Sequence, residues 1–295
     1  MNADKTKKLT DRLNETGFPF QEWCFKCVKD SCGILSRQEF PYTFPPSSQS
    51  IKGDVNSIDI LSLKIPYDQW RDHCWVYYFI ECKKSKLGVK NWCFIKTNRS
   101  PKPTPSRFFA GHFYKNEDQV SLGFQSQFID HDRLFGPEAD VVIHGYEVNN
   151  TLDRLNRNQE EKIYKSAMQA VLACSWLESL KTPLIPGFAN ENYIAVWAKG
   201  VIPIDYPAVV SMPVLVTTSE IFVASIVAED VDGATGEISA ENVRWEKREL
   251  VIYDLGLPDW LQDENLPSYT RGVVVINQSA FKKFLDINYD KYTLS

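Results

Sequence analysis

The chain has 295 residues, of which 43% are hydrophobic and 13% aromatic, so it can bury a full core and is not a disordered chain. A formal net charge of −5 excludes a protein that coats nucleic acid through bulk positive charge. The longest apolar run, residues 208–228, is interrupted by Pro213 and Glu220, and residues 1–11 are charged without an apolar signal region. These features favour a cytoplasmic protein and exclude a membrane span.

The first predicted helix begins at Phe18 and ends near Cys32, where Gly33 would stop it. One apolar stripe at helical spacing follows this segment and consists of Phe20, Cys24, Cys27 and Val28. Cys24 and Cys27 also have the spacing of half a zinc site, but no second Cys or His pair lies nearby at ligand spacing. The stripe is therefore interpreted as core. The seven cysteines of the chain, an odd number, are interpreted as reduced thiols.

Three strands are expected next. Residues 34–44 alternate aromatic and polar side chains, 45–50 form a Pro- and Ser-rich loop, and apolar residues from Ile58 to Ile65 make a second strand. A third strand runs from Val76 to Lys83. The order is thus helix, strand, strand, strand.

An acid, Asp59, lies near the middle of the second of these strands, and an acid and a lysine lie two residues apart in the third. Glu81 and Lys83 are two residues apart, so they project from the same face of a strand, whereas Cys82 points away. If the strands pair antiparallel, Asp59 can meet Glu81. Two carboxylates and an amine at one place can bind Mg²⁺ and hold a phosphate, which is the chemistry of phosphodiester hydrolysis. An isolated pattern of this kind is weak, but here an apolar strand runs directly into the charged residues.

Four segments together resemble the PD-(D/E)XK nucleases: Gly17-Phe18-Pro19-Phe20-Gln21 before a helix, Ser57-Ile58-Asp59-Ile60, Ile80-Glu81-Cys82-Lys83-Lys84, and Asn91-Trp92-Cys93-Phe94. Ile58 stands in place of the proline in the family motif. The resemblance covers roughly the first hundred residues. It implies an α/β, restriction-endonuclease-like fold, in which helices flank a mixed central sheet.

The resemblance also implies a set of site residues. Asp59, Glu81 and the main-chain carbonyl of Cys82 would bind Mg²⁺ or Mn²⁺, and Lys83 would orient the attacking water. Gln21 or Glu22 on the first helix would complete the site through water, and the choice between them stays open. The implied substrate is DNA, with RNA not excluded, in restriction, repair or defence against foreign DNA.

The segment that follows is basic. Residues 82–116 contain no Asp or Glu but nine Lys or Arg, in a chain that is acidic overall. A phosphate backbone requires such a segment next to the site, so DNA contacts are predicted. The predicted contact residues are Lys84, Lys86, Lys90, Lys102 and Arg107. Trp92 and Phe94 are interpreted as core, and residues 100–106, which are rich in proline, as a loop over the cleft.

The rest of the chain gives further elements but no second catalytic pattern. His112, His131 and His144 match no ligand spacing. Residues 140–146 are expected to form a strand, 159–180 a helix whose Lys165 and Gln169 lie off its apolar face, and 214–217 with 221–224 a strand pair that completes the sheet. Residues 229–268 hold eleven Asp or Glu. A strand over 273–276 and a helix over 279–285 follow.

These observations predict a nuclease-like core in residues 1–228, with a basic insertion around 84–156, and an acidic C-terminal extension, 229–295, packed on that core. Two roles for the extension stay open: it covers the basic cleft, or it meets a partner, either a second copy or another protein. The predicted function is that of a metal-dependent nuclease. The alternative is a nucleic-acid-binding or regulatory module that keeps the fold without cutting, and the presence of Asp59, Glu81 and Lys83 together argues against it.

Overall fold

The computed structural model describes residues 3–32, 36–42, 56–64, 74–85, 89–96, 107–115, 122–149, 158–180, 208–257 and 270–289. The helices are α1 (Ala3–Glu15), α2 (Phe18–Cys32), α3 (His131–Phe135), α4 (Asn158–Leu180) and α6 (Gln278–Leu285), with two 3₁₀ turns, η1 (Ala228–Asp230) and η2 (Ala240–Asn242). The strands are β1 (Ser36–Tyr42), β2 (Asn56–Lys64), β3 (Trp75–Lys83), β4 (Val89–Lys96), β5 (Arg107–Lys115), β6 (Leu122–Asp130), β7 (Val141–Asn149), β8 (Ala208–Thr217), β9 (Glu220–Ser225), β10 (Arg244–Arg248), β11 (Leu250–Gly256) and β12 (Thr270–Asn277).

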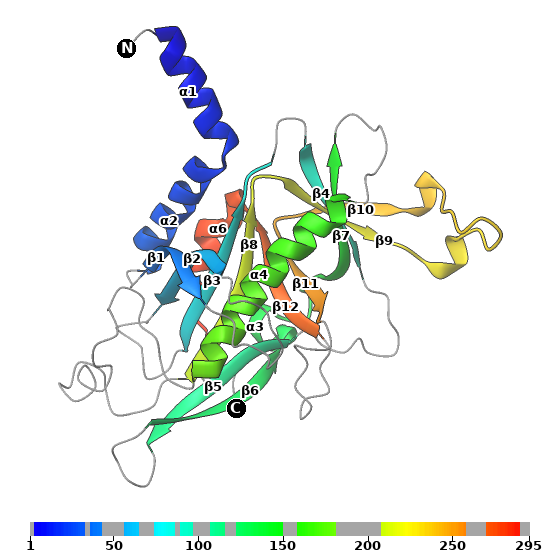
Figure 1. Ribbon diagram of the computed structural model, residues 1–295. Coiled ribbons are helices and arrows are strands. Elements are labelled where there is room, and N and C mark those ends of the chain that lie inside the picture. Colours follow the sequence, from blue (N-terminus) through cyan, green and yellow to red (C-terminus); the bar gives the residue numbers. More distant parts are fainter. Residues whose placement is uncertain are drawn as a thin grey trace, which may run out of the picture.

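The described strands form one mixed sheet of twelve strands (Figure 1). Its main path has the order β1-β2-β3-β8-β12-β11-β7-β4-β9-β10, and the β5–β6 hairpin branches from β8. The pairs β3–β8, β8–β12, β7–β11 and β4–β9 are parallel. The expected mixed α/β architecture with a large mixed sheet is therefore confirmed.

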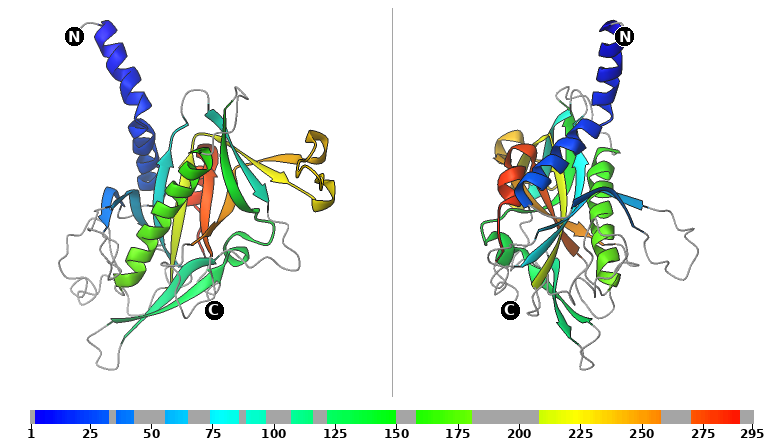
Figure 2. Two further views of the ribbon diagram at one scale, coloured as in Figure 1. Left: turned by 45° about the vertical axis from the view of Figure 1, so that its right-hand side comes forward. Right: turned by 90° about the vertical axis from the view of Figure 1, so that its left-hand side faces the viewer.

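Helices cover both faces of this sheet. α4 crosses one face, and α2 and α6 lie on the other, as the edge-on view in Figure 2 shows. On the α4 side, alternate β3 residues such as Tyr77 and Phe79 pack with Ala170 and Cys174 of the helix. The opposite β3 residues, such as Tyr78, pack with α2 and α6. Both faces of β3 are therefore apolar up to Ile80, and the strand is buried on both sides.

The local sequence explains where α2 begins. Gly17 has a φ of +81°, a conformation that glycine adopts without strain, and its carbonyl accepts hydrogen bonds from the first turn, at Phe20 (3.0 Å) and Gln21 (3.2 Å). Pro19 lies in that first turn, where a missing N–H costs nothing. The predicted apolar stripe is buried in one cluster with the sheet, which confirms its interpretation as core. Gly17 thus sets the start of the helix that carries Gln21.

The acidic last third of the chain contributes strands to the middle of the sheet. Residues 229–295 were expected to pack on the core as an extension. β12 instead lies between β8 and β11, pairing parallel with the first and antiparallel with the second. Val273, Val274, Val275 and Ile276 are all fully buried. This part of the segment is therefore inside the sheet that carries β3.

One predicted pairing is wrong. The strands over 214–217 and 221–224 exist as parts of β8 and β9, but they do not pair with each other. β8 is bonded to β3 on one edge and to β5 and β12 on the other. Both edges of β8 are occupied by these strands. After the bend at Thr218-Ser219 the chain therefore continues as β9, which pairs with β4 and β10 instead.

No helix among the described residues is long and apolar enough to cross a membrane. The proline-rich segment 100–106, which was expected to cover the cleft, lies outside the described residues.

A test of the buried position of β12 is the substitution Gly272→Ala. A Cβ atom at Gly272 would lie 2.7 Å from Cε2 of the buried Phe108, so one of the two must shift. We expect a loss of about 1–3 kcal/mol in the free energy of unfolding, measured by urea denaturation. Gly256→Ala, at the end of β11, is the matched control because nothing lies within 4 Å of its added atom. Equal urea midpoints for the two variants would contradict the packing of Phe108 over β12.

Candidate active site

The candidate site lies where the ladder between β2 and β3 ends. The strands pair antiparallel, as predicted, from Lys64 opposite Val76 to Ile60 opposite Ile80. Beyond that point the main-chain N–H of Cys82 donates to Asp59 Oδ2 at 2.7 Å. A buried N–H must find an acceptor, and here a side-chain carboxylate replaces a main-chain carbonyl. Asp59 is therefore held against the main chain that carries Glu81.

Glu81 and Lys83 project together from β3, as their spacing predicts. Lys83 Nζ donates to Glu81 Oε2 at 2.8 Å, and the Glu81 side chain is 1% exposed whereas that of Lys83 is 37% exposed. The other carboxylate oxygen, Glu81 Oε1, is buried and has no hydrogen-bond partner among the described residues. A buried, half-satisfied carboxylate is costly and needs a physical reason.

The charges of the site shift one another's pKa values. Burial, followed by repulsion from Asp59, raises the pKa of Glu81 from 4.5 to about 7. Burial also raises the pKa of Asp59, more than the hydrogen bond from Cys82 lowers it. Burial works to lower the pKa of Lys83, but the attraction of Glu81 outweighs it and the pKa lies above its usual value. The carboxylates therefore repel each other, and Lys83 stays cationic.

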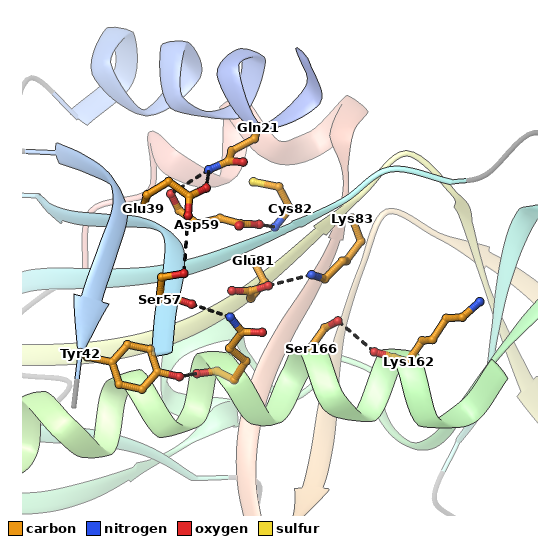
Figure 3. A network of polar contacts seen from close by, with 11 residues as sticks. Gln21, Glu39, Tyr42, Ser57, Asp59, Glu81, Cys82, Lys83, Lys162 and Ser166 are labelled. Carbon is orange, nitrogen blue, oxygen red and sulfur yellow. Dashed lines mark hydrogen bonds and ion pairs between the residues drawn. The ribbon is translucent and has the colours of Figure 1, made fainter. Parts of the chain in front are cut away.

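Of the two first-helix candidates, Gln21 is the one that contacts Asp59. Its side chain is buried, and Nε2 donates to the Asp59 carbonyl at 3.3 Å and to Glu39 Oε1 at 2.6 Å. Glu22 is exposed and accepts from Gln38 at 3.0 Å instead. Figure 3 shows Gln21 on the same side of the sheet as Asp59, with Glu81 and Lys83 on the side of α4.

Three side chains near the site were not predicted from the sequence. Glu39 of β1 holds Gln21, the Gln169 amide donates to the Ser57 carbonyl, and Tyr42 donates to the Gln169 carbonyl. Gln169 was noticed only as a residue off the apolar face of its helix. The contact with Tyr42 joins residues 127 positions apart in sequence. Such partners cannot be inferred from local patterns.

The predicted DNA-contact residues that the structure describes lie apart from one another. Lys84 donates to the Asn14 carbonyl at the end of α1 (2.5 Å), and Arg107 pairs with Asp130 of β6 (3.3 Å). Lys90 belongs to β4, five strand positions from β3, or roughly 24 Å at the usual strand spacing. The Lys90 side chain, and all of Lys86 and Lys102, lie outside the described residues. Neighbours in sequence are therefore distributed across the sheet.

The residues present fit a hard cation in part. No group of three or more His, Cys, Asp or Glu side chains that could hold a metal ion occurs within the described ranges. Mg²⁺ does not need such a group, because it commonly takes one or two carboxylates and keeps several waters. The buried, unpartnered Oε1 of Glu81 is an oxygen of the type that such an ion binds. Asp59, which adds to the raised pKa of Glu81, is the second nearby carboxylate.

Comparisons with known proteins found no match: no family model, no curated protein and no solved structure is similar to this chain at the threshold applied.

The raised pKa of Glu81 predicts a pH-dependent stability of the metal-free protein. The folded state binds more protons than the unfolded state between pH 4.5 and about 7, so stability falls as pH rises through this window. Relative to Glu81→Gln, the wild-type protein should lose on the order of 3 kcal/mol between pH 4.5 and pH 8. Urea denaturation in the presence of a chelator measures this difference.

The exposed Glu229→Gln is the control and should keep the pH dependence of the wild-type protein. If Glu81→Gln also keeps it, Glu81 is not the group whose burial makes the protein less stable at neutral pH.

Proposed function

We propose that the chain is a metal-dependent nuclease of the PD-(D/E)XK type, which hydrolyses phosphodiester bonds in DNA with Mg²⁺ or Mn²⁺. The observation that carries the proposal is the buried carboxylate of Glu81. One of its oxygens is bonded to Lys83 and the other has no partner among the described residues, at the point where β2 and β3 separate. A site built only for stability would not bury a charge in this way.

In this proposal Asp59, Glu81 and the main-chain carbonyl of Cys82 hold the cation. The ion, when bound, would act as a Lewis acid on the phosphodiester and lower the pKa of water. Asp59 is positioned for this role because its Oδ2 is fixed by the Cys82 N–H, which leaves Oδ1 outside that bond. A cation bound at Glu81 would also offset the repulsion from Asp59 that raises the pKa of Glu81.

Lys83 supplies the positive charge on the same face. In the metal-free protein its ammonium forms an ion pair with Glu81. With the Glu81 charge shared with a cation, the same ammonium can hold the attacking water or a phosphate oxygen and stabilise charge in the transition state. Its partial exposure places it at the boundary between the buried carboxylate and solvent.

Helix α1, whose end contacts the residue after Lys83, also carries basic residues. Its end is tied to Lys84, the neighbour of Lys83, and the helix projects away from the sheet (Figure 1). Lys5, Lys8 and Arg12 recur three and four positions apart, so they lie along one side of an exposed helix. Lys8 pairs with Asp4 at 3.1 Å, and Asp11 and Glu15 lie on the same helix, so α1 supplies only a small excess of positive charge for a nucleic acid.

Metal binding is tested by thermal unfolding with and without Mg²⁺ or Mn²⁺. An ion that binds only the native state at ten times its dissociation constant adds about 1.4 kcal/mol of stability, so the melting temperature should rise by a few degrees. Asp59→Ala should remove most of this rise. An unchanged rise in the variant would place the ligands elsewhere.

Catalysis is tested by single-turnover cleavage of single-stranded DNA, double-stranded DNA and RNA. Lys83→Ala should lower the rate by about 100-fold or more while metal binding is kept. Lys84→Ala, at the residue that follows the end of β3, should cost no more than a few-fold, because its amine is bonded to the Asn14 carbonyl. Equal losses of cleavage rate in the two variants would mean that the positive charge of this segment determines the rate, and not the position of Lys83.

Cleavage of none of these substrates, with nucleic-acid binding intact, would instead support a module that keeps the fold without cutting.

A further inference from the structure

One edge of β8 changes its partner strand partway along its length. This edge is bonded to β5 through residues 208–211 and to β12 through residues 214–217. The beginnings of β5 and β12 meet at the change, where a Cβ atom added to Gly272 would lie 2.7 Å from the ring of Phe108. Between the two ladders the edge of β8 has no partner in the described sheet. Side chains, and not main-chain bonds, therefore fill this junction.

A pocket lies at the junction, on the side of the sheet that α4 covers where it crosses β8 (Figure 1). Its lining includes Arg107 of β5, Arg271 of β12, Ser211 and Pro213 of β8, and Ser175 of α4. The pocket is partly open to solvent, and its interior has room for about one water-sized group. The two arginines are the only charged residues among the described residues that line it. Two guanidinium groups at one small polar pocket favour an anion.

Ser211 gives independent support for a ligand in this pocket. The residue is 1% exposed, and its Oγ is buried without a hydrogen-bond partner among the described residues. It also interrupts a run of apolar residues in the middle of β8. A buried hydroxyl without a partner reduces stability, and an alanine or valine would avoid that loss. Because Ser211 lines the pocket, its hydroxyl can donate to a group bound there.

Strand β6 holds both arginines in place. Arg107 Nε pairs with Asp130 Oδ1 at 3.3 Å, and the Arg271 guanidinium lies over the ring of Phe128, 4.0 Å from its centre. Stacking uses the face of a guanidinium, whereas its N–H groups lie around the rim. The Arg107 side chain is 27% exposed, so an anion can reach it from solvent. Asp130 is the carboxylate beside the pocket, and the sum of the three charges stays positive.

We propose that this pocket binds a phosphate group, with one oxygen at Ser211 and the others at Arg107 and Arg271. A carboxylate is planar, and one arginine can satisfy both of its oxygens. Donors from three different strands instead suit a tetrahedral group with more oxygens. Ser211 is four residues before Leu215, which lies opposite Glu81, so the pocket is roughly 13 Å along β8 from the candidate active site. Phosphate binding there does not depend on the metal chemistry of the proposed function.

Binding is tested on the whole chain with inorganic phosphate and with a short thymidine oligonucleotide, both in the presence of a chelator. Phosphate should raise the melting temperature by a few degrees over sodium chloride at the same ionic strength. Arg271→Gln should weaken phosphate binding about 10-fold or more, because it removes a charge-assisted hydrogen bond. Ser211→Ala should also weaken it about 10-fold but should not lower the phosphate-free melting temperature, because the hydroxyl has no partner to lose among the described residues.

Arg37→Gln and Ser166→Ala are the matched controls. Arg37 is an exposed arginine of β1 that lies over the ring of Phe40, as Arg271 lies over Phe128. Ser166 is a buried serine of α4 whose hydroxyl donates to the Lys162 carbonyl at 2.9 Å. Both variants should bind phosphate like wild type, and Ser166→Ala should lower the melting temperature instead, since it loses a hydrogen bond.

The two sources of a phosphate group are distinguishable. A nucleic-acid backbone is the source if Arg271→Gln also weakens oligonucleotide binding and phosphate competes with the oligonucleotide. Free phosphate is the source if the oligonucleotide binds this variant and wild type equally. If phosphate does not raise the melting temperature, or raises it equally in wild type, Arg271→Gln and Ser211→Ala, the phosphate site is overturned. Since no metal is present, a failure of the cleavage assay does not affect this result.

Discussion

The hydrogen bond from the Cys82 main chain to Asp59 depends on two strands that stop pairing while both continue. Past Ile80, β3 has N–H groups that β2 no longer meets, and burial makes an unpaired N–H costly. A side chain with acceptor oxygens is needed at that position, and aspartate is short enough to reach back to the neighbouring strand. The same requirement that ends the ladder therefore also fixes a carboxylate next to Glu81.

Glu81 makes this arrangement unfavourable for the protein without a cation. Its charge is buried and repelled by Asp59, and Lys83 and the Asp59 main chain compensate it only in part, so its pKa stays raised. A well-packed apolar residue would avoid that cost, since a buried ion pair is often no more stable than its hydrophobic replacement. The strained backbone of Glu39, which also costs stability, lies opposite Asp59 in the ladder between β1 and β2. Several features that reduce folding stability therefore occur at one place. This is typical of a functional site, whereas a site that served stability alone would avoid them.

Local patterns predicted most elements and failed for pairings between distant segments. The limits of α2, β2 and β3 follow from apolar periodicity within each segment, and the face shared by Glu81 and Lys83 follows from the strand period of two. The position of β12 beside β8 joins residues about sixty apart, which no local signal specifies. The dispersal of Lys84, Lys90 and Arg107 has the same cause. The φ of Glu39 is set by tertiary contacts and has no signature in a strand of ordinary composition.

The chemical groups of the site and the frame that holds them come from different parts of the chain. Gln21, Glu39, Asp59, Glu81 and Lys83 all lie before residue 85, but β3 is bonded to β8, more than 120 residues later, from Trp75 through Lys83. The Lys83 carbonyl accepts from the Thr218 N–H, and Ser85 bonds to Thr218 and Ser219, so the pairing continues past the strand end. β3 is thus fixed along its whole length on one edge and only as far as Ile80 on the other. That asymmetry lets β2 separate from β3 at Asp59 while β8 holds Glu81 in place, although the two charges repel each other.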